Sequence, residues 1–217
     1  MTGRALTFAE LWRRTAALAS PVLLQSAIWL TILTGLGIAA DLTWRQEQLS
    51  NLLSLIAACA VTVAQFAVTC AVLRSAVPSG RPLASFGRFF LLTIVSGLAL
   101  ILGFLLLVLP GIFLAIRWSA SVPALLERNL DVGESLRLSW RQTRGHEWTI
   151  LLLIISIWLP AILLGGTTVA LNPYGPSVAG SLLLNLSINL ALLAAWHAGV
   201  AIHFATDDKK EVGEVFA

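Results

Sequence analysis

The chain has 217 residues, of which 58% are hydrophobic and 12% are charged, and its mean hydropathy is +0.87. Soluble domains are about half apolar and about a quarter charged, so this composition excludes an ordinary water-soluble globular protein. The formal net charge is +3, but the basic residues flank apolar runs, where membrane topology requires them. We therefore expect anionic membrane lipids, and no nucleic acid, as the acidic partner.

Six long apolar runs predict six membrane-spanning helices in a single integral membrane domain, residues 1–217. A helix crosses a hydrocarbon core of ~30 Å with ~20 residues, and only a helix satisfies the backbone of such runs in lipid. The predicted spans are about 17–40, 52–73, 89–109, 110–126, 149–171 and 178–204. The fourth is the shortest and is interrupted. The expected fold is an all-α polytopic helical bundle of three hairpins, with a cytoplasmic amphipathic helix at about 131–145.

The first apolar run is longer than the ~7–15 residues of a signal-peptide core, so we expect it to remain as a span. The second run holds both cysteines, Cys59 and Cys70. On a helix they lie ~16 Å apart, which is too far for a disulfide. Their spacing is also not that of metal ligands. We therefore expect packing thiols.

The basic residues predict the orientation of the bundle. Twelve of the fourteen fall in the N-terminal segment, the loops after spans two and four, and the C-terminal tail. The opposite loops hold only Arg45, and the uncharged segment 172–176 is predicted to be an external turn. By the positive-inside rule, both termini face the cytoplasm. Low lysine with abundant arginine and alanine favours a bacterial source, and therefore the plasma (inner) membrane.

Arg117 is the outstanding polar residue, because it lies about seven positions into the predicted fourth span. A charge at that depth needs a partner or a wet cavity. The side chain either extends past Pro110 to the external interface or pairs with a polar residue of another helix. The candidate partners are Gln25, Gln65, Asn185, Asn189 and His197. Arg117 is accordingly a structural clamp or a cation that binds a substrate.

The sixth span carries a second set of polar candidates. Asn185 and Asn189 share one helix face, and His197 and His203 follow further along. They either form hydrogen bonds between helices or line a proton path or ligand site. The helical H-E-x-x-H spacing, a nucleophile elbow and a glycine-rich phosphate loop are missing. The sequence therefore predicts no catalytic residue, no metal site and no cofactor.

The loop after the fourth span predicts an amphipathic helix. Asp131 and Glu134 have the spacing of a capping box at its start, and Gly145 marks its end. Val132, Leu136 and Trp140 recur at i, i+4 and i+8, and a basic stripe lies beside them. The stripe is Arg137, Arg141 and Arg144. This pattern is typical of a helix in the membrane interface, which either binds lipid headgroups or anchors the connection.

The stretch 109–148 contains a series of motif residues. They are Leu109-Pro110-Gly111-Ile112, Arg117, Pro123, Glu127, Glu134-Ser135-Leu136, Ser139-Trp140, Gly145 and Trp148. This series resembles the signature of the glycerophosphoryl diester phosphodiesterase membrane-domain family and the related YciC-type inner-membrane proteins. The resemblance implies an integral membrane protein of undefined function. Ser135 stands where the family has alanine, and the chain shows no phosphodiesterase catalytic domain, so that activity is not implied.

The physical chemistry of this series predicts three local features. Pro110 and Gly111 let the chain reverse at the external surface. Pro123 opens the hydrogen-bond ladder of the fourth span near its cytoplasmic end. Glu127 then lies at the cytoplasmic interface, where we expect it to dock the amphipathic helix through an ion pair. The expected partners are Arg137, Arg141 and Arg144.

Three functions are compatible with these observations. The first is a non-enzymatic membrane component that organises or binds lipids or partner proteins, as a homo-oligomer or with another membrane protein. The second is a small transporter, or transporter subunit, for an anionic substrate. The third is an intramembrane enzyme that acts on lipid, with Arg117 and Glu127 at its site. A dry, paired Arg117 favours the first function, and a water-accessible Arg117 favours the second.

Overall fold

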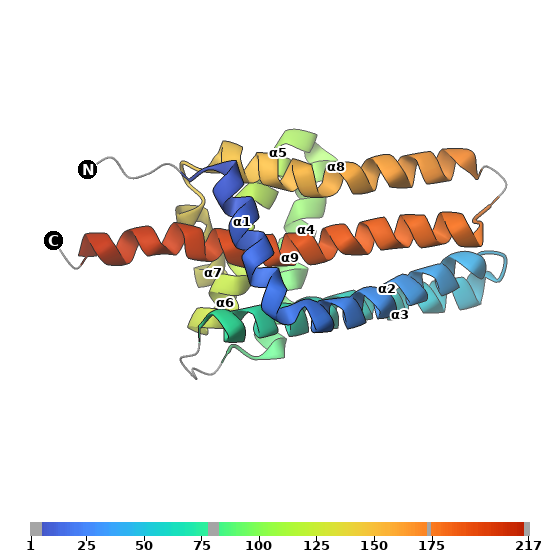
Figure 1. Ribbon diagram of the computed structural model, residues 1–217, viewed down its shortest axis with the longest axis horizontal. Coiled ribbons are helices and arrows are strands. Elements are labelled where there is room, and N and C mark those ends of the chain that lie inside the picture. Colours follow the sequence, from blue (N-terminus) through green and yellow to red (C-terminus); the bar gives the residue numbers. More distant parts are fainter. Residues whose placement is uncertain (1–5, 78–82, 173–174, 215–217) are drawn as a thin grey trace. The chain divides into compact units, whose positions relative to one another are not determined.

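The computed structural model describes residues 6–77, 83–172 and 175–214, with the backbone alone for 208–214. Within these residues every regular element is a helix (Figure 1). The elements are α1 (Phe8–Ala19), a 3₁₀ turn (Ser20–Val22), α2 (Leu23–Leu42), α3 (Glu47–Ala76), α4 (Phe86–Leu106), α5 (Val108–Arg117), α6 (Ser121–Arg128), α7 (Val132–Gln142), α8 (Glu147–Leu171) and α9 (Val178–Glu214). The predicted all-α fold is confirmed.

Six helical segments in the described part of the chain are long and apolar enough to cross a membrane. They are Phe8–Leu42, Glu47–Ala76, Phe86–Leu106, Val108–Arg128, Glu147–Leu171 and Val178–Asp207. Many of their large apolar side chains point outward, among them Leu105 and Leu171, which are 79% and 81% exposed. Such surfaces are stable only against lipid or a partner. The chain is therefore a multi-pass membrane protein.

The first predicted span, 17–40, covers the end of one helix and most of the next. Phe8–Ala19 forms a separate helix, α1, whose N-terminus is capped by Thr7: its hydroxyl accepts from the backbone N–H of Glu10 at 3.3 Å. The 3₁₀ turn that follows α1 contains Pro21, which cannot donate a backbone hydrogen bond to a continuous helix. The length of the apolar run was enough to predict a span. It could not show that the run contains two consecutive helices.

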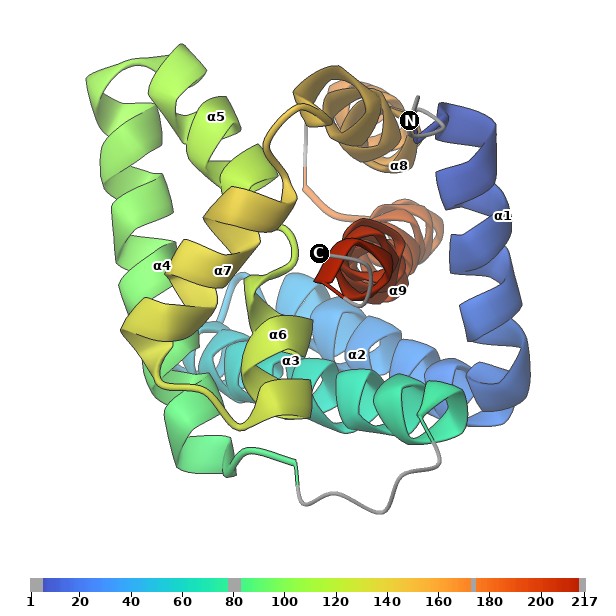
Figure 2. The ribbon, with the colours of Figure 1, turned by 90° about the vertical axis from the view of Figure 1, so that its left-hand side faces the viewer.

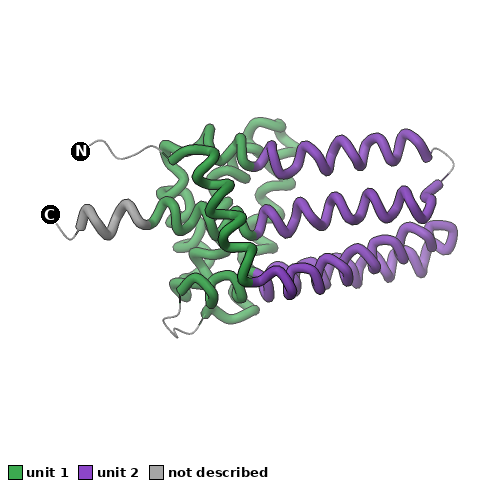
Figure 3. The backbone as a smooth tube through the Cα atoms, in the orientation of Figure 1, with its two compact units in different colours: residues 1–21, 69–153, 197–217 green, residues 22–68, 154–196 purple. Residues whose placement is uncertain are grey.

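The chain divides into two compact units, which are coloured separately in Figure 3. Unit 1 contains residues 1–21, 69–153 and 197–217, and unit 2 contains residues 22–68 and 154–196. Three long helices, α3, α8 and α9, each contribute to both units. The predicted external turn at 172–176 belongs to unit 2, and Pro173 and Tyr174 lie outside the described residues.

Unit 2 contains an antiparallel pair formed by α2 and the first part of α3. Gln25, near the start of α2, donates to the carbonyl of Ala67 at 3.3 Å, and Ser50, near the start of α3, donates to the carbonyl of Ala40 at 3.1 Å. α9 adds to this pair through Asn185, whose amide donates to Asp41 at 2.7 Å. Most residues of two predicted hairpins, α2–α3 and α8–α9, belong to this unit.

Unit 1 is built around the C-terminal part of α9. Nearly every side chain of this part is buried, including Val200, Ala201 and Ile202. Figure 2 shows α1 on one side of this part of α9 and the group α4 to α7 on the other. A helix that is buried on all sides cannot be amphipathic, which agrees with the apolar character of the last predicted span.

The α4–α5 hairpin belongs to unit 1 and differs from the prediction. The chain reverses at Leu107, the one residue between the two helices, and Pro110 and Gly111 lie in the first turn of α5 instead. The role of Gly111 is close packing: a Cβ there would lie 2.5 Å from the ring of Phe104. A Cβ on Gly103 would lie 3.1 Å from the backbone of Gly111. The two glycines allow α4 and α5 to approach each other.

Candidate functional site

The fourth span is broken, because α5 ends at Arg117 and α6 begins at Ser121. Pro123 lies in the first turn of α6, and in a continuous helix its ring would clash with the carbonyl four residues earlier, that of Ser119. Gly199 of α9 lies beside this carbonyl, since a Cβ there would be 2.9 Å from the oxygen of Ser119. The predicted opening of the helix ahead of Pro123 is confirmed, and glycine allows α9 to approach it.

A serine of α7 fills this break. Ser139 is fully buried, and its hydroxyl donates to the carbonyl of Arg117 at 2.7 Å and accepts from the N–H of Ala120 at 3.2 Å. Thr143, also fully buried, donates to the carbonyls of Ser139 at 2.9 Å and of Arg117 at 3.4 Å. These hydroxyls satisfy backbone groups that a continuous helix would pair internally. They join both halves of the fourth span to α7.

α7 contacts the rest of unit 1 through a small and mostly polar face. The buried residues of the helix are Ser135, Leu138, Ser139 and Gln142. Its apolar ridge lies outside this face: Val132 and Leu136 are partly exposed, and Trp140 is 39% exposed. Only the exposed parts of these three side chains can face lipid. The side of the helix that contacts the protein is one that sequence periodicity did not predict.

The predicted ends of the amphipathic helix are close to the observed ones. Asp131 and Glu134 form the expected capping box, in which the Glu134 carboxylate accepts from the N–H of Asp131 at 3.2 Å. α7 ends at Gln142, and Gly145 follows with φ = +84°. That backbone conformation favours glycine, so Gly145 forms the turn that leads into α8.

Arg117 lies at the C-terminal end of α5, where it pairs with a carboxylate. Its Nη2 is 2.7 Å from Oε1 of Glu147, in the first turn of α8. The guanidinium also stacks against the rings of Phe113 and Trp140, at 5.0 and 5.2 Å from their centroids. The residue is 8% exposed. Cation–π contacts with two rings account for a guanidinium whose Nε and Nη1 have no hydrogen-bond partner among the described residues.

Arg117 thus pairs with a polar residue of another helix, as one of the two predicted alternatives had it, but the named candidate partners were wrong. The side chain neither extends past Pro110 nor pairs with one of the five proposed polar residues. The sequence did not point to Glu147 because this residue lies just before the apolar run of the fifth span, 30 positions after Arg117. The fold brings Glu147 to the C-terminal end of α5, where Arg117 lies. The carboxylate at the beginning of a helix and the cation at the end of another each agree with the local helix dipole.

Glu127 belongs to a second polar cluster, in which His203 and Gln142 are buried and Glu127 is partly exposed. Its Oε2 is 2.5 Å from Nε2 of His203, which is fully buried on α9. The other ring nitrogen, Nδ1, is 3.1 Å from Oε1 of Gln142 on α7. Gln142 in turn donates to Asp207 at 3.1 Å, and Asp207 pairs with Arg128. The cluster connects α6, α7 and α9.

The chemistry of this cluster fixes where the hydrogens are. A carboxylate only accepts, so the Gln142 amide nitrogen must face Asp207 and its oxygen must face His203. Nδ1 of His203 therefore carries a hydrogen. The other ring nitrogen, Nε2, faces the carboxylate of Glu127. The expected ion pairs from Glu127 to Arg137, Arg141 or Arg144 were wrong, because Glu127 contacts His203 on the core side of α6.

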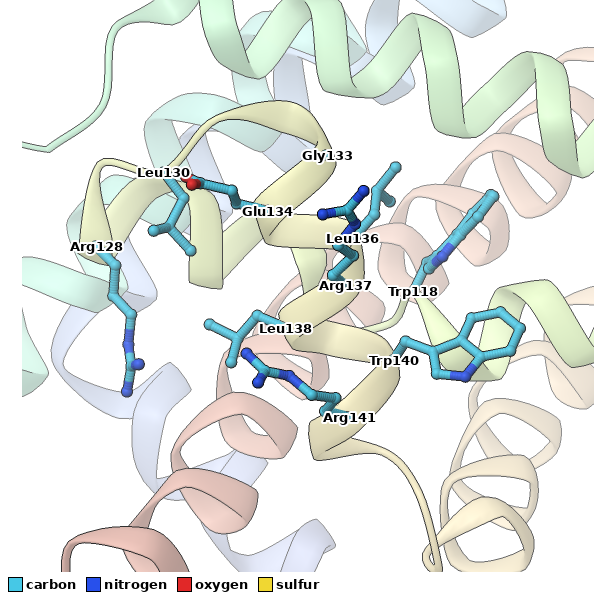
Figure 4. Close-up of a pocket in the computed structure, with 10 residues that line it drawn as sticks. All are labelled: Trp118, Arg128, Leu130, Gly133, Glu134, Leu136, Arg137, Leu138, Trp140 and Arg141. Atoms are coloured by element: carbon cyan, nitrogen blue, oxygen red, sulfur yellow. The ribbon is translucent and has the colours of Figure 1, made fainter.

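The three arginines of the basic stripe are exposed. None of Arg137, Arg141 and Arg144 forms an ion pair with an acidic side chain in the described part of the chain. Arg137 and Arg141 line a groove of about 890 Å³ together with Arg128, Glu134, Trp118, Trp140 and neighbouring leucines. Figure 4 shows Leu138 and Arg141 extending toward the side on which Arg128 lies, with Trp118 and Trp140 on the opposite side of α7.

The polar residues of the sixth span have separate structural surroundings. Asn185 pairs with Asp41, as described above, and Asn189 lies 3.4 Å from the hydroxyl of Thr34, both in unit 2. His197 is buried in unit 1. Among the described residues, no group of three or more His, Cys, Asp or Glu is placed to hold a metal ion.

Comparison with protein-family models, with curated proteins and with solved structures finds no match to this chain. The site is therefore defined by its geometry. Gln142, Glu147 and Asp207 are the members that sequence reasoning missed. None of the three belongs to a motif: Glu147 and Asp207 lie next to apolar runs, and Gln142 lies in the predicted amphipathic helix.

We predict that Ser139→Ala lowers the free energy of unfolding by about 1–3 kcal/mol, because it leaves the buried N–H of Ala120 without a partner and removes the shorter of the two hydrogen bonds to the carbonyl of Arg117. The measurement is equilibrium unfolding of the purified protein in detergent. Ser135→Ala is the matched control: Ser135 is equally buried on α7, but its hydroxyl bonds only to the carbonyl of Val132 in the same helix. The control should be nearly neutral, and equal losses would contradict the role of Ser139.

We also predict strong coupling between Glu127 and His203. Removing one partner of a buried pair costs ~3–5 kcal/mol, because the other is left unpaired. The variants Glu127→Ala and His203→Ala and their combination should give a coupling energy of ~0.5–3 kcal/mol in the same unfolding assay. The control cycle combines Glu127→Ala with Arg137→Ala and should be additive. Coupling to Arg137 without coupling to His203 would refute the observed pairing.

Proposed function

We propose that this protein is a non-enzymatic component of the plasma membrane that binds anionic lipids through α7. One observation carries this proposal: α7 is docked by its small polar face, which leaves Arg137, Arg141 and parts of its apolar ridge exposed, and the two arginines form no ion pair among the described residues. A surface helix with exposed apolar and basic sides is suited to the headgroup region of a bilayer. Guanidinium groups bind phosphate through paired hydrogen bonds.

We infer that α7 and both termini face the cytoplasm. The support is the distribution of basic residues, twelve of which fall on one side of the predicted spans. The cytoplasmic leaflet is also the one whose anionic lipids attract basic segments, by ~1 kcal/mol per arginine or lysine. A lipid-binding α7 and this orientation therefore support each other.

We further propose that the chain is related to the glycerophosphoryl diester phosphodiesterase membrane-domain family. The residues that carry the resemblance have structural roles that a family could share: Pro123 at the helix break, Ser139 within it and Arg117 and Glu127 in buried pairs. None of these roles requires a bound substrate. The proposal thus extends to a common scaffold and not to a phosphodiesterase reaction.

A transporter for an anionic substrate is the second candidate function. The observation in its favour is the break between α5 and α6 beside a buried arginine, since broken helices often hold transported ions. The surroundings of Arg117 argue against a transporter, because Glu147 and two aromatic rings already contact the guanidinium. A substrate anion would have to displace Glu147.

We predict that the protein enriches anionic lipid around itself. The wild type is extracted from the membrane in polymer-bounded particles, and the lipids in the particles and in the bulk membrane are quantified by mass spectrometry. Replacing Arg137 and Arg141 with glutamine should remove the enrichment, since each of these two arginines contributes ~1 kcal/mol. Arg45→Gln, on the opposite side, is the control and should retain it. Wild-type particles with the bulk lipid composition would refute lipid binding.

We predict that position 117 is closed to water. Arg117→Cys, in a protein whose Cys59 and Cys70 are replaced by alanine, should not react with a membrane-impermeant thiol reagent applied from either side. Arg144→Cys in the same background should react, because Arg144 is exposed. Labelling at position 117 in a folded protein would instead reveal a wet cavity and favour the transporter.

A further inference from the structure

We propose that the groove on α7 is a binding site for a single anionic phospholipid, with its phosphate at Arg137 and Arg141 and its acyl chains against the neighbouring tryptophans and leucines. This inference rests on the proposed function and goes further, because it assigns one ligand to one site. General attraction of lipid to a basic surface requires no groove and no particular arginine.

The charges around the groove leave two cations without a partner. Arg128 is paired with Asp207, and Glu134 is committed to the cap of α7. Arg137 and Arg141 line the groove and form no ion pair among the described residues. The groove therefore presents two arginines to a ligand, which is the charge that a phosphodiester headgroup complements. A guanidinium can donate two parallel hydrogen bonds to such a group.

The size and the apolar lining of the groove favour a lipid over a free anion. Its volume of about 890 Å³ is close to the upper end of the ~300–1,000 Å³ range of small-molecule sites. An inorganic phosphate would fill a small part of it. Leu136, Trp118 and Trp140 line the groove together with the arginines. Aromatic side chains of this kind lie at the level where acyl chains meet headgroups.

The contacts beneath α7 hold these side chains in position. Ser139 bonds to the break in the fourth span, and Gln142 bonds to His203 and Asp207. Trp140 is fixed from one side by Arg117 and from another by Phe113, whose ring centroid is 5.4 Å away. A site on a fixed helix needs less ordering when the ligand binds than a flexible basic segment does.

The experiment is a lipid titration of the purified full-length protein in neutral detergent, followed by thermal unfolding. A ligand that binds only the folded state raises the melting temperature by an amount that grows with the logarithm of one plus the ratio of the ligand concentration to Kd. Phosphatidylglycerol is the probe, and phosphatidylcholine and inorganic phosphate are the comparison ligands. Phosphatidylglycerol should raise the melting temperature progressively once its concentration exceeds its Kd, and the other two should not. Arg137→Gln with Arg141→Gln should weaken its apparent affinity about 25-fold, or about fivefold for each single variant.

Arg144→Gln is the matched control, because Arg144 is exposed on the same segment but does not line the groove. It should keep the wild-type affinity. All variants should melt like the wild type without lipid, and the single variants serve if the double variant does not fold. An equal loss in Arg144→Gln would overturn the groove while leaving general lipid binding intact. An equal shift with inorganic phosphate would overturn the lipid ligand. An absence of anionic-lipid enrichment in native particles would contradict both proposals.

Discussion

The structure of unit 1 depends on how the chain pairs the backbone groups that are released where the fourth span breaks. A buried carbonyl or N–H without a partner costs several kcal/mol in an apolar environment, where water cannot replace the lost bond. Ser139 supplies both a donor and an acceptor at this point, so the break becomes the place where α7 binds. Pro123 makes the break necessary, and Gly199 allows α9 to approach it.

Charged groups inside unit 1 follow the same rule of local pairing. Arg117 finds Glu147 and two aromatic faces, and His203 finds Glu127 and Gln142. Each pair joins helices that are distant in the sequence, so the pairs specify which helix ends come together. Ion pairs of this kind add little net stability compared with apolar packing, but breaking one is costly.

The exposed side of α7 follows from this arrangement. Because small polar residues make the contact with the protein, the arginines and the apolar ridge are left for another partner. An amphipathic helix that packed through its apolar ridge would instead present only charge. The docking of α7 therefore explains why a lipid-binding surface is the function that the geometry supports best, and why that surface is held in place.

Run length and the positions of arginine were sufficient to predict a six-span all-α membrane protein, since the bilayer permits few other structures for such runs. The capping box and the interruption ahead of Pro123 were also predictable, because their causes act within a few residues. The separate helix α1 and the reversal at Leu107 were not, because an uninterrupted apolar run does not mark where a helix ends. The partners of Arg117 and Glu127 were decided by the tertiary structure alone. Pairing across helices depends on which faces meet, and apolar spans of similar length carry almost no local information about that choice.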